Sequence, residues 1–592
     1  MTGEIIQYEH QGAQKAAERK ERKTMKKLFA LFLVLVMMLS LVLSGCSDVE
    51  STPTTEPGKT EAPGQESTGG EATEPPKADP VVLKVWVQNS TRVSDYNDNK
   101  MTTWLEEQGN FDLQITSIPS ADFKTKINMA LTVGAIEELP DVIIGNNKSM
   151  LAASVMEWAD AGSIIPLTEY YKDPELAKNI NDSIEITGVD YPSMLRMPDG
   201  EIYTFGNLNQ SFGDEYPAKT WIYKPWLDAL NMDIPKTTED FYKVLKAVSE
   251  TDLNGNGKHD EIPFVGAAAT YTNYIPFLMN AFTYAGDHEG LYKIVEDGVI
   301  SSAVTTEEFK EGLKYVRQLF QEKLILNESL TMVKDQFEVL VNTEEHTVFA
   351  FTFSSPSIIT NVEDVAANYI AIEPLIGPEG VQYASYKQTA PDSRMIITAN
   401  CKNPEAAFKL GDLMSSEYIG ITQRWGEQGV NWDYTADAKD AQNWESAFDE
   451  FPLYIVAYDD NSFWGLKEPT NVSWMQTGIV VRGYHVASGR GVPVGSVSPY
   501  TQHVNEAQEM YWKGGYAPEE TITALVYTED EGVVVSETQA TLKSYIEEYI
   551  GAVMMGNKNL EGDWDAFQAE LEKIGLSDYL AAVQSAYDRM YK

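Results

Sequence analysis

Cysteine and histidine are scarce in this sequence, and their scarcity excludes several kinds of protein. The chain has two cysteines, Cys46 and Cys401, and six histidines. Two cysteines cannot build a disulfide-rich scaffold or a cysteine-based zinc site. The histidines show no metal-ligand spacing such as HExxH, and no GxxxxGK motif for nucleotide hydrolysis is present.

Positive charge is also in short supply. Lys and Arg number 45 against 89 Asp and Glu, which leaves a formal net charge of −44. A protein this negative repels nucleic acid, so we expect no nucleic-acid partner. The same charge disfavours a polyanionic ligand unless a local basic pocket overrides it.

Only one stretch is apolar enough to enter a bilayer, and it is short. It runs from Leu28 to Leu43, 16 residues, where a spanning helix needs roughly 20. Lys26 and Lys27 precede it, and the run Leu43-Ser44-Gly45-Cys46 follows it. This pattern resembles a bacterial lipoprotein signal, which implies cleavage before Cys46 and a diacylglyceryl group on its sulfur. An ordinary signal peptide with a chance cysteine is the alternative.

The first 79 residues are therefore predicted to be a secretion signal followed by a flexible membrane anchor segment. We expect residues 1–24 to be an upstream extension and 25–45 the signal peptide. Residues 46–79 would be the lipidated cysteine with a flexible linker, because they are rich in Ser, Thr, Gly, Pro and Glu and bury little apolar surface. The predicted location is the outer face of the cytoplasmic membrane of a Gram-positive bacterium, held by the lipid anchor only.

From Val81 onward the pattern changes to that of a folded α/β protein. Apolar strands are predicted at 81–87, 111–118 and 139–145, with helices between them. Strand–helix alternation is typical of a parallel sheet covered on both faces. Ligands bind such sheets at the carboxyl ends of the strands, so the loops after Val87 and Gly145 are candidate contacts.

The most informative segment is an acidic loop that follows a predicted helix from Thr237 to Glu250. Thr237 and Asp240 suit a capping box, and the apolar stripe behind them is Phe241, Val244, Leu245 and Val248. The loop begins at Asp252 and alternates oxygen-bearing side chains as an EF-hand does, with Gly257 at the sixth position.

This loop predicts one structural calcium ion. Its oxygen donors suit calcium far better than zinc. The twelfth position, which holds a bidentate Glu in an EF-hand, is Pro263 here. Glu261 at the tenth position would take over the role of that ligand. The predicted ligands are Asp252, Asn254, Asn256, Lys258 through its carbonyl, Asp260 and Glu261. An ordinary Asn/Gly turn is the alternative.

Several segments together resemble family 1 of the bacterial extracellular solute-binding proteins, in particular its large lipoprotein branch. They are WIYKPWLDALNMDIPKTTEDFYKVLKAVSETDLNGNGKHDEIP, LPDVIIG, PLIGPEG, ITANCKNPEAAFKLGDLM, RWGEQGVNWDY and QSAYDR. The branch includes alginate-oligosaccharide-binding proteins that carry a calcium loop of this type. The resemblance covers nearly the whole chain from Val81.

The resemblance implies a type II periplasmic-binding-protein fold, an α/β fold of two lobes joined by crossing strands with a ligand cleft between them. The first lobe would comprise 80–215 plus 391–460, and the second 216–390 plus 461–592. It also implies a monomer that delivers an oligosaccharide to the permease subunits and ATPase of an ABC importer.

Aromatic and planar polar side chains near predicted loops are the candidate sugar contacts, because sugars stack on rings and pair their hydroxyls with amides and charged groups. Core packing is the alternative for each ring. The candidates are Trp86, Gln88, Asn89, Asp141, Tyr271, Arg394, Trp432 and Trp464.

Two other functions remain open. A ligand-presenting sensory or adhesive surface lipoprotein would have the same sequence features. A secreted polysaccharide-degrading enzyme would need a positioned acid–base pair, and none stands in a recognisable catalytic context. We therefore predict a binding protein and not an enzyme.

Overall fold

The computed structural model describes residues 79–592 except 147, 268–271, 287–288, 360–362, 435–443, 446–452, 456–467, 488–491 and 494–498. The proposed signal, Cys46 and all but the last residue of the predicted linker lie outside the described residues, and so do two candidate contacts, Tyr271 and Trp464. Within the described part of the chain, no helix is both long enough and apolar enough to cross a membrane.

The first lobe is built on a six-stranded sheet in the order β15-β4-β11-β3-β1-β2. The first strand, β1, pairs in parallel with β2 and β3, whereas β11 runs antiparallel between β3 and β4. The strands are β1 (Val81–Gln88), β2 (Phe111–Ile118), β3 (Val142–Ile144), β4 (Thr204–Asn209), β11 (Asp392–Ile397) and β15 (Val481–Arg482).

Helices cover both faces of this sheet, as strand–helix alternation predicts. On β3, Val142 and Ile144 belong to one apolar cluster and Ile143 to another, because successive side chains point to opposite faces. One face is covered mainly by α2, α6, α14 and α15, and the other by α3 and α4. The helices of this lobe are α2 (Lys100–Gly109), α3 (Ser120–Val133), α4 (Ala152–Asp160), α5 (Thr168–Tyr171), α6 (Lys178–Thr187), α14 (Pro404–Met414), α15 (Glu417–Trp425) and α16 (Tyr484–Ala487).

The second lobe contains a four-stranded sheet in the order β10-β5-β9-β6. Strand β9 pairs in parallel with β6 and antiparallel with β5. Its strands are β5 (Lys219–Tyr223), β6 (Ile262–Val265), β9 (Val348–Phe353) and β10 (Tyr369–Ala371), and a hairpin of β7 (Lys293–Glu296) and β8 (Val299–Ser302) stands apart. Its helices are α8 (Lys224–Ala229), α9 (Thr238–Ser249), α10 (Ile275–Met279), α11 (Glu307–Gln321), α12 (Lys334–Val341), α13 (Glu363–Ala366), α17 (Pro499–Gly514), α18 (Glu529–Met554), α19 (Leu560–Ile574) and α20 (Leu576–Tyr591).

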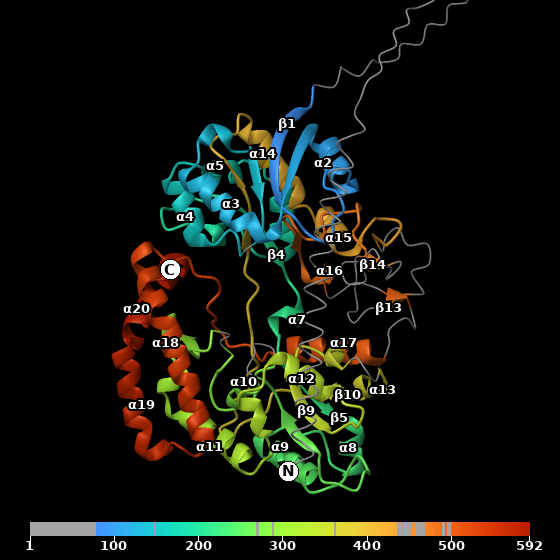
Figure 1. Ribbon diagram of the computed structural model, residues 1–592, viewed down its shortest axis with the longest axis vertical. Coiled ribbons are helices and arrows are strands. Elements are labelled where there is room, and N and C mark those ends of the chain that lie inside the picture. The colour runs from blue at the N-terminus through green and yellow to red at the C-terminus, as the bar shows by residue number, and fades with distance from the viewer. Residues whose placement is uncertain are drawn as a thin grey trace, which may run out of the picture. The chain divides into compact units, whose positions relative to one another are not determined.

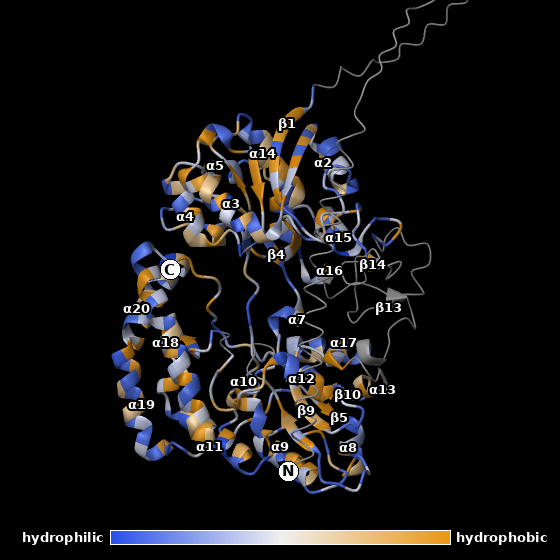
Figure 2. Cartoon of the chain, in the orientation of Figure 1, coloured by the Kyte–Doolittle hydropathy of each residue, from blue (hydrophilic) through white to orange (hydrophobic). Residues whose placement is uncertain are grey.

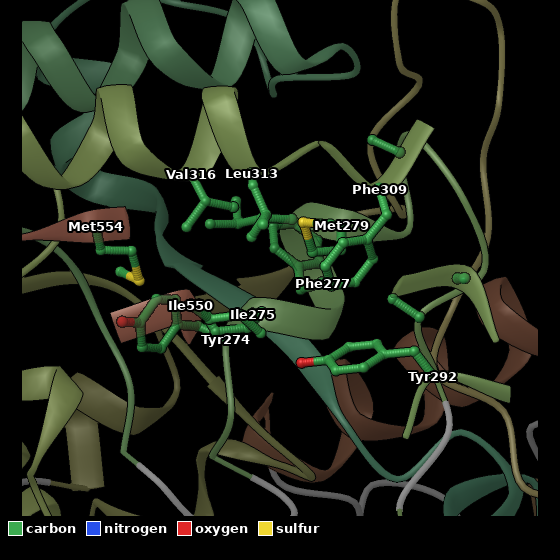
Figure 3. Close-up of a cluster of buried hydrophobic side chains, with 14 of the residues drawn as sticks. Tyr274, Ile275, Phe277, Met279, Tyr292, Phe309, Leu313, Val316, Ile550 and Met554 are labelled. Carbon is green, nitrogen blue, oxygen red and sulfur yellow. The ribbon is translucent and has the colours of Figure 1, made fainter. Parts of the chain in front are cut away.

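One large apolar cluster joins this sheet to the helices at the end of the chain. Figure 3 shows side chains of α10, α11 and α18 pointing toward one another, among them Phe277, Leu313 and Ile550. In Figure 2 the helices α18, α19 and α20 carry both orange and blue along their length, as amphipathic helices do. Each fully buried aliphatic or aromatic side chain contributes about 1.5–3 kcal/mol.

The structure confirms the predicted start of α9. The Thr237 hydroxyl accepts a hydrogen bond from the Asp240 N–H at 3.1 Å, and the Asp240 carboxylate accepts one from the Thr237 N–H at 3.2 Å. The stripe Phe241, Val244, Leu245 and Val248 is buried, with at most 1% exposed. This capping box fixes the helix that leads into the acidic loop.

Two described segments connect the lobes (Figure 1), and we call them the first crossing segment, residues 210–218, and the second crossing segment, residues 372–391. After β15 the chain returns to the second lobe and continues through α17 and a segment at 515–528. The predicted division placed 461–592 in the second lobe, but β15 pairs with β4 and Trp474 lies in the first lobe's core. A two-residue strand leaves too little apolar pattern to be seen in a sequence.

Two further short strand pairings and one short helix lie outside the elements given above. They comprise α7 (Phe212–Glu215), β12 (Trp432–Tyr434), β13 (Trp444–Glu445), β14 (Leu453–Ile455) and β16 (Val492–Pro493). Here β12 pairs with β14, and β13 with β16.

Candidate functional site

At the carboxyl end of β1, Gln88 holds the first lobe's loops together. Its amide nitrogen donates to the Ser120 hydroxyl at 2.6 Å, and its amide oxygen accepts from the Asn146 N–H at 3.0 Å. The side chain is only 5% exposed. Gln88 therefore fixes the loop after β3 against the start of α3. The neighbouring Asn89 is exposed to solvent, so its side chain can reach a ligand.

Trp86 is half-buried against the core on the α3 side of the sheet. The Lys126 ammonium lies 4.6 Å from its ring centroid, a cation–π contact that covers part of one face.

Asp141 lies away from the residues at the carboxyl strand ends. It stands just before β3, at the amino end of that strand, and its carboxylate accepts from the Lys84 N–H at 2.8 Å. Its contacts are those of a group that pins two strands. The prediction overlooked that a residue before a parallel strand lies at the opposite edge from the ligand loops.

Arg394 and Trp432 are also engaged with the protein itself. The Arg394 guanidinium pairs with the Asp392 carboxylate through both Nε and Nη2. Trp432 is fully buried with Trp425 and Leu453, and its indole N–H donates to the Gly426 carbonyl at 3.0 Å. A ring with no exposed surface offers no face to a sugar, so core packing accounts for Trp432.

The structure brings together a different set of residues around a cavity of about 1690 Å³. Its walls come from the end of β4, the two crossing segments, the β7–β8 hairpin, the chain that precedes this hairpin, the start of α11, and the segment at 515–528. Four aromatic side chains contribute to the lining: Phe282, Tyr284, Tyr383 and Tyr386.

The tyrosines of this cavity are held in place by one another. The Tyr284 hydroxyl donates to the Tyr386 carbonyl at 2.9 Å, and the rings of Tyr284 and Tyr383 meet edge to face at 5.8 Å. Burial, with the nearby Glu215 carboxylate, raises the pKa of Tyr386 above its ordinary value, so its hydroxyl stays neutral. These rings offer both apolar faces and hydrogen-bonding hydroxyls.

Polar contacts tie the cavity's walls together. The buried Glu215 carboxylate, in the first crossing segment, accepts hydrogen bonds from the hydroxyls of Tyr484 at 2.6 Å and Thr389 at 2.8 Å. In the second crossing segment, the Gln388 amide oxygen accepts from the hydroxyls of Thr521 and Thr523, each at 2.7 Å. The geometry of the cavity therefore depends on contacts between segments far apart in sequence.

The sequence reasoning missed all four cavity aromatics. One signal was available: Tyr383 and Tyr386 lie three residues apart in the polar run YASYKQT, next to the predicted crossing at residue 390. Aromatic residues in a polar run have few apolar neighbours in the sequence, which favours a ligand-facing role, although Tyr386 also packs against the buried ring of Tyr216.

The acidic loop wraps around Asp252. The Asp252 carboxylate accepts from the N–H groups of Gly255 at 2.8 Å and Gly257 at 2.9 Å, and both glycines adopt positive φ, 73° and 80°. The Glu261 carboxylate accepts from the Leu253 and Asn254 N–H groups at 2.7 Å and 3.1 Å. The loop is thus closed at both ends by its own carboxylates.

The remaining donors of the loop converge on Asp260. The amide nitrogens of Asn254 and Asn256 lie 3.0 Å and 3.2 Å from its carboxylate, and this hydrogen bonding lowers the pKa of Asp260 below its ordinary value. Among the residues that the structure describes, no group of three or more His, Cys, Asp or Glu is arranged to hold a metal. The loop's donor set, however, is mixed, with carboxylate, amide and carbonyl oxygens, which fits a hard cation.

The loop lies at the amino ends of two strands of the second sheet. It leads directly into β6, and the Asn254 amide donates to the carbonyl of His346, just before β9, at 3.4 Å. Because β6 and β9 are parallel, their carboxyl ends lie at the other edge of the sheet. The loop can therefore support the sheet without touching a ligand there.

Two α/β lobes linked by crossing segments, with a large aromatic and polar cavity at the crossings, define a two-lobed ligand-binding protein. Residues 91–418 match the bacterial extracellular solute-binding proteins, and the chain belongs to this family.

Known relatives agree with this assignment. The chain is 26% identical to the fructooligosaccharide ABC transporter substrate-binding protein FusA of Streptococcus pneumoniae, over 84% of this chain and 88% of that protein. A solved HMO-binding solute-binding protein of Bifidobacterium longum infantis shares 18% identity with a TM-score of 0.68, covering 87% of this chain and 100% of that one. An EF-hand mutant of S. pneumoniae FusA with fructo-nystose shares 22% identity with a TM-score of 0.60, covering 86% and 99%. The predicted family and two-lobe fold are confirmed.

Proposed function

We propose that this protein captures an oligosaccharide in the cavity at its crossing segments and delivers it to the permease subunits of an ABC importer. The observation that carries the proposal is the cavity itself, which combines four aromatic side chains with many hydrogen-bonding groups. Family membership and the likeness to FusA support a role in import. The relatives are binding proteins, so we propose binding without catalysis.

The size of the cavity supports a ligand longer than one sugar. Drug-sized ligands occupy pockets of roughly 300–1,000 Å³, whereas this cavity measures about 1690 Å³. Ring faces such as those of Tyr284 and Tyr383 suit the apolar faces of sugars, and the surrounding amides and hydroxyls suit their hydroxyl groups. An oligosaccharide uses both kinds of contact along its length.

A thermal-shift screen of the soluble form, Ser47–Lys592, tests this function. Any ligand that binds only the native state raises the apparent melting temperature. We expect oligosaccharides from plants or algae to do so, and Tyr383→Ala to weaken the response. The matched control is Tyr242→Ala, at a partly buried tyrosine of the same lobe that is not among the cavity's lining residues. A response to peptides alone, with none to any saccharide, would contradict the proposal.

We further propose that Cys46 carries a lipid that anchors the protein to the outer face of the membrane, as the run from Leu43 to Cys46 indicates. Cys46→Ala should abolish incorporation of radiolabelled lipid and release the protein into the medium, because no other thiol follows the signal closely. Cys401→Ala is the control and should keep its label. Labelling of the Cys46 variant would refute the anchor.

The acidic loop is proposed to hold one structural calcium ion. Asp252, Asn254, Asn256, Asp260 and Glu261 would supply side-chain oxygens, and Lys258 its carbonyl; the asparagine amides would turn their oxygens toward the ion. Support comes from the alternating donors, the two positive-φ glycines and the EF-hand of FusA. Calcium here would neutralise the loop's three carboxylates and fix the connection from α9 to β6.

A further inference from the structure

The walls of the cavity carry many more negative than positive side chains. Eight carboxylates and two lysines contribute to its lining. Two of the carboxylates are neutralised locally, since Glu289 pairs with Lys293 and Asp392 pairs with Arg394. Within the described part of the chain, the other six form no ion pair; they are Asp214, Glu296, Asp297, Glu308, Glu519 and Glu520. Lys387 is the remaining cation of the lining.

These carboxylates come from elements that lie far apart in the sequence. Glu296 and Asp297 stand at the turn of the β7–β8 hairpin, and Glu308 lies in the first turn of α11. The Glu520 carboxylate accepts from the Gly298 N–H at 3.0 Å, which holds the segment at 515–528 against that turn. The concentration of negative charge is thus a product of the tertiary fold.

We propose that this cavity selects uncharged oligosaccharides and rejects those built from uronic acids. Carboxylates are good acceptors for sugar hydroxyls, so a neutral saccharide gains hydrogen bonds from the same groups that repel an anion. A uronate would bring a further negative charge close to several unneutralised carboxylates, which is unfavourable at such short range. This inference rests on the proposed oligosaccharide-binding function.

Paired saccharides of equal length test the selection. Calorimetry on the Ser47–Lys592 form would compare galacto-oligosaccharides with oligogalacturonates, and manno-oligosaccharides with oligomannuronates. We expect the uronates of each pair to bind at least tenfold more weakly, and the gap to shrink as salt rises, because salt screens charge. Uronates that bind as tightly as their neutral counterparts would overturn the selection but leave oligosaccharide binding standing. Binding of no saccharide at all would instead overturn the proposed function.

A triple substitution separates the cavity's charge from the charge of the whole protein. The variant Glu296→Gln, Asp297→Asn, Glu308→Gln removes three charges at the wall, and Asn suits the positive φ of 51° at position 297. Its uronate-to-neutral affinity ratio should rise about tenfold. The control Glu107→Gln, Asp112→Asn, Glu137→Gln removes three exposed charges of the first lobe outside the cavity lining and should leave the ratio unchanged. An equal change of the affinity ratio in the cavity variant and the control variant, or no change in the cavity variant, would overturn the proposal. If the triple variant is too unstable to measure, Glu308→Gln alone makes the same test.

Discussion

Removal of calcium is expected to lower the melting temperature of this protein by several degrees, and added calcium to restore it. An ion that binds only the native state stabilises it by about 2.7 kcal/mol when its concentration is one hundred times its Kd. Without the ion, the negative charges of Asp252, Asp260 and Glu261 stay unneutralised by a cation within one loop of ten residues. Differential scanning calorimetry with and without a chelator measures the effect.

Asp252→Asn shows whether this loop is the source of the response. Asp252 closes the loop through two N–H groups, so the amide keeps one acceptor while it loses the charge that attracts the ion. The variant should melt near the chelated wild type and no longer respond to calcium. Asp233→Asn, an exposed residue in the same lobe, makes the same charge change and should respond as the wild type does. Identical wild-type curves with and without chelator would reduce the loop to an ordinary turn.

Lys219 is expected to make the protein's stability depend on pH above neutrality. It begins β5, directly after the first crossing segment, and is only 1% exposed. Its ammonium donates to the Tyr216 carbonyl at 2.5 Å and lies 5.5 Å from the ring centroid of Tyr511. Burial lowers the pKa of Lys219 from 10.5 to about 7, against a smaller raising effect of Asp214.

The direction of this pH dependence follows from the number of protons that the folded and unfolded states bind. Between about pH 7 and 10.5 the unfolded chain holds a proton on this lysine that the native protein lacks, so stability rises with pH across that window. Below pH 7 both states are protonated, and the native state bears the full cost of a buried charge, on the order of several kcal/mol. Lys219→Met removes that cost but also leaves the Tyr216 carbonyl without its donor, which costs about 1–3 kcal/mol at every pH.

Denaturant unfolding of wild type and Lys219→Met from pH 6 to 9.5 provides the measurement. The free energy of unfolding of the variant, minus that of the wild type, should fall steadily as pH rises. Lys236→Met, at an exposed lysine of the same lobe, should show a constant difference. If the free energies of unfolding of wild type and Lys219→Met ran parallel across this pH range, Lys219 would have to stay charged in the native protein. Contacts other than those with the Tyr216 carbonyl and the Tyr511 ring would then have to stabilise that charge.

Local features were predictable because the information for them lies close together in the chain. The strands at 81–87 and 111–118 show runs or alternations of apolar residues, and the structure has β1 and β2 there. The capping box of α9 needs only Thr237 and Asp240, three positions apart. The donors of the acidic loop lie within ten residues, so their spacing alone indicates the chemistry of the site.

The ligand contacts were harder to predict, because the type of a residue does not reveal which groups its side chain contacts in the folded protein. Gln88 follows a strand, as a ligand contact would, yet its amide is engaged with Ser120 and Asn146. Trp432 stands in a polar run, yet it is fully buried. The same side chain can bind a ligand or stabilise a loop, and only its neighbours in space distinguish the two.

By itself, the sequence determined the family, the two-lobe α/β fold, the candidate anchor at Cys46 and the candidate calcium loop, since each depends on short-range patterns or on resemblance along the chain. Only the tertiary structure decided the cavity. Its walls join Asp214, Tyr284, Tyr386 and Thr521, which are separated by up to about three hundred positions. Such residues meet because the chain passes repeatedly between the lobes, and the packing of whole elements, not any local pattern, sets which side chains face the same space.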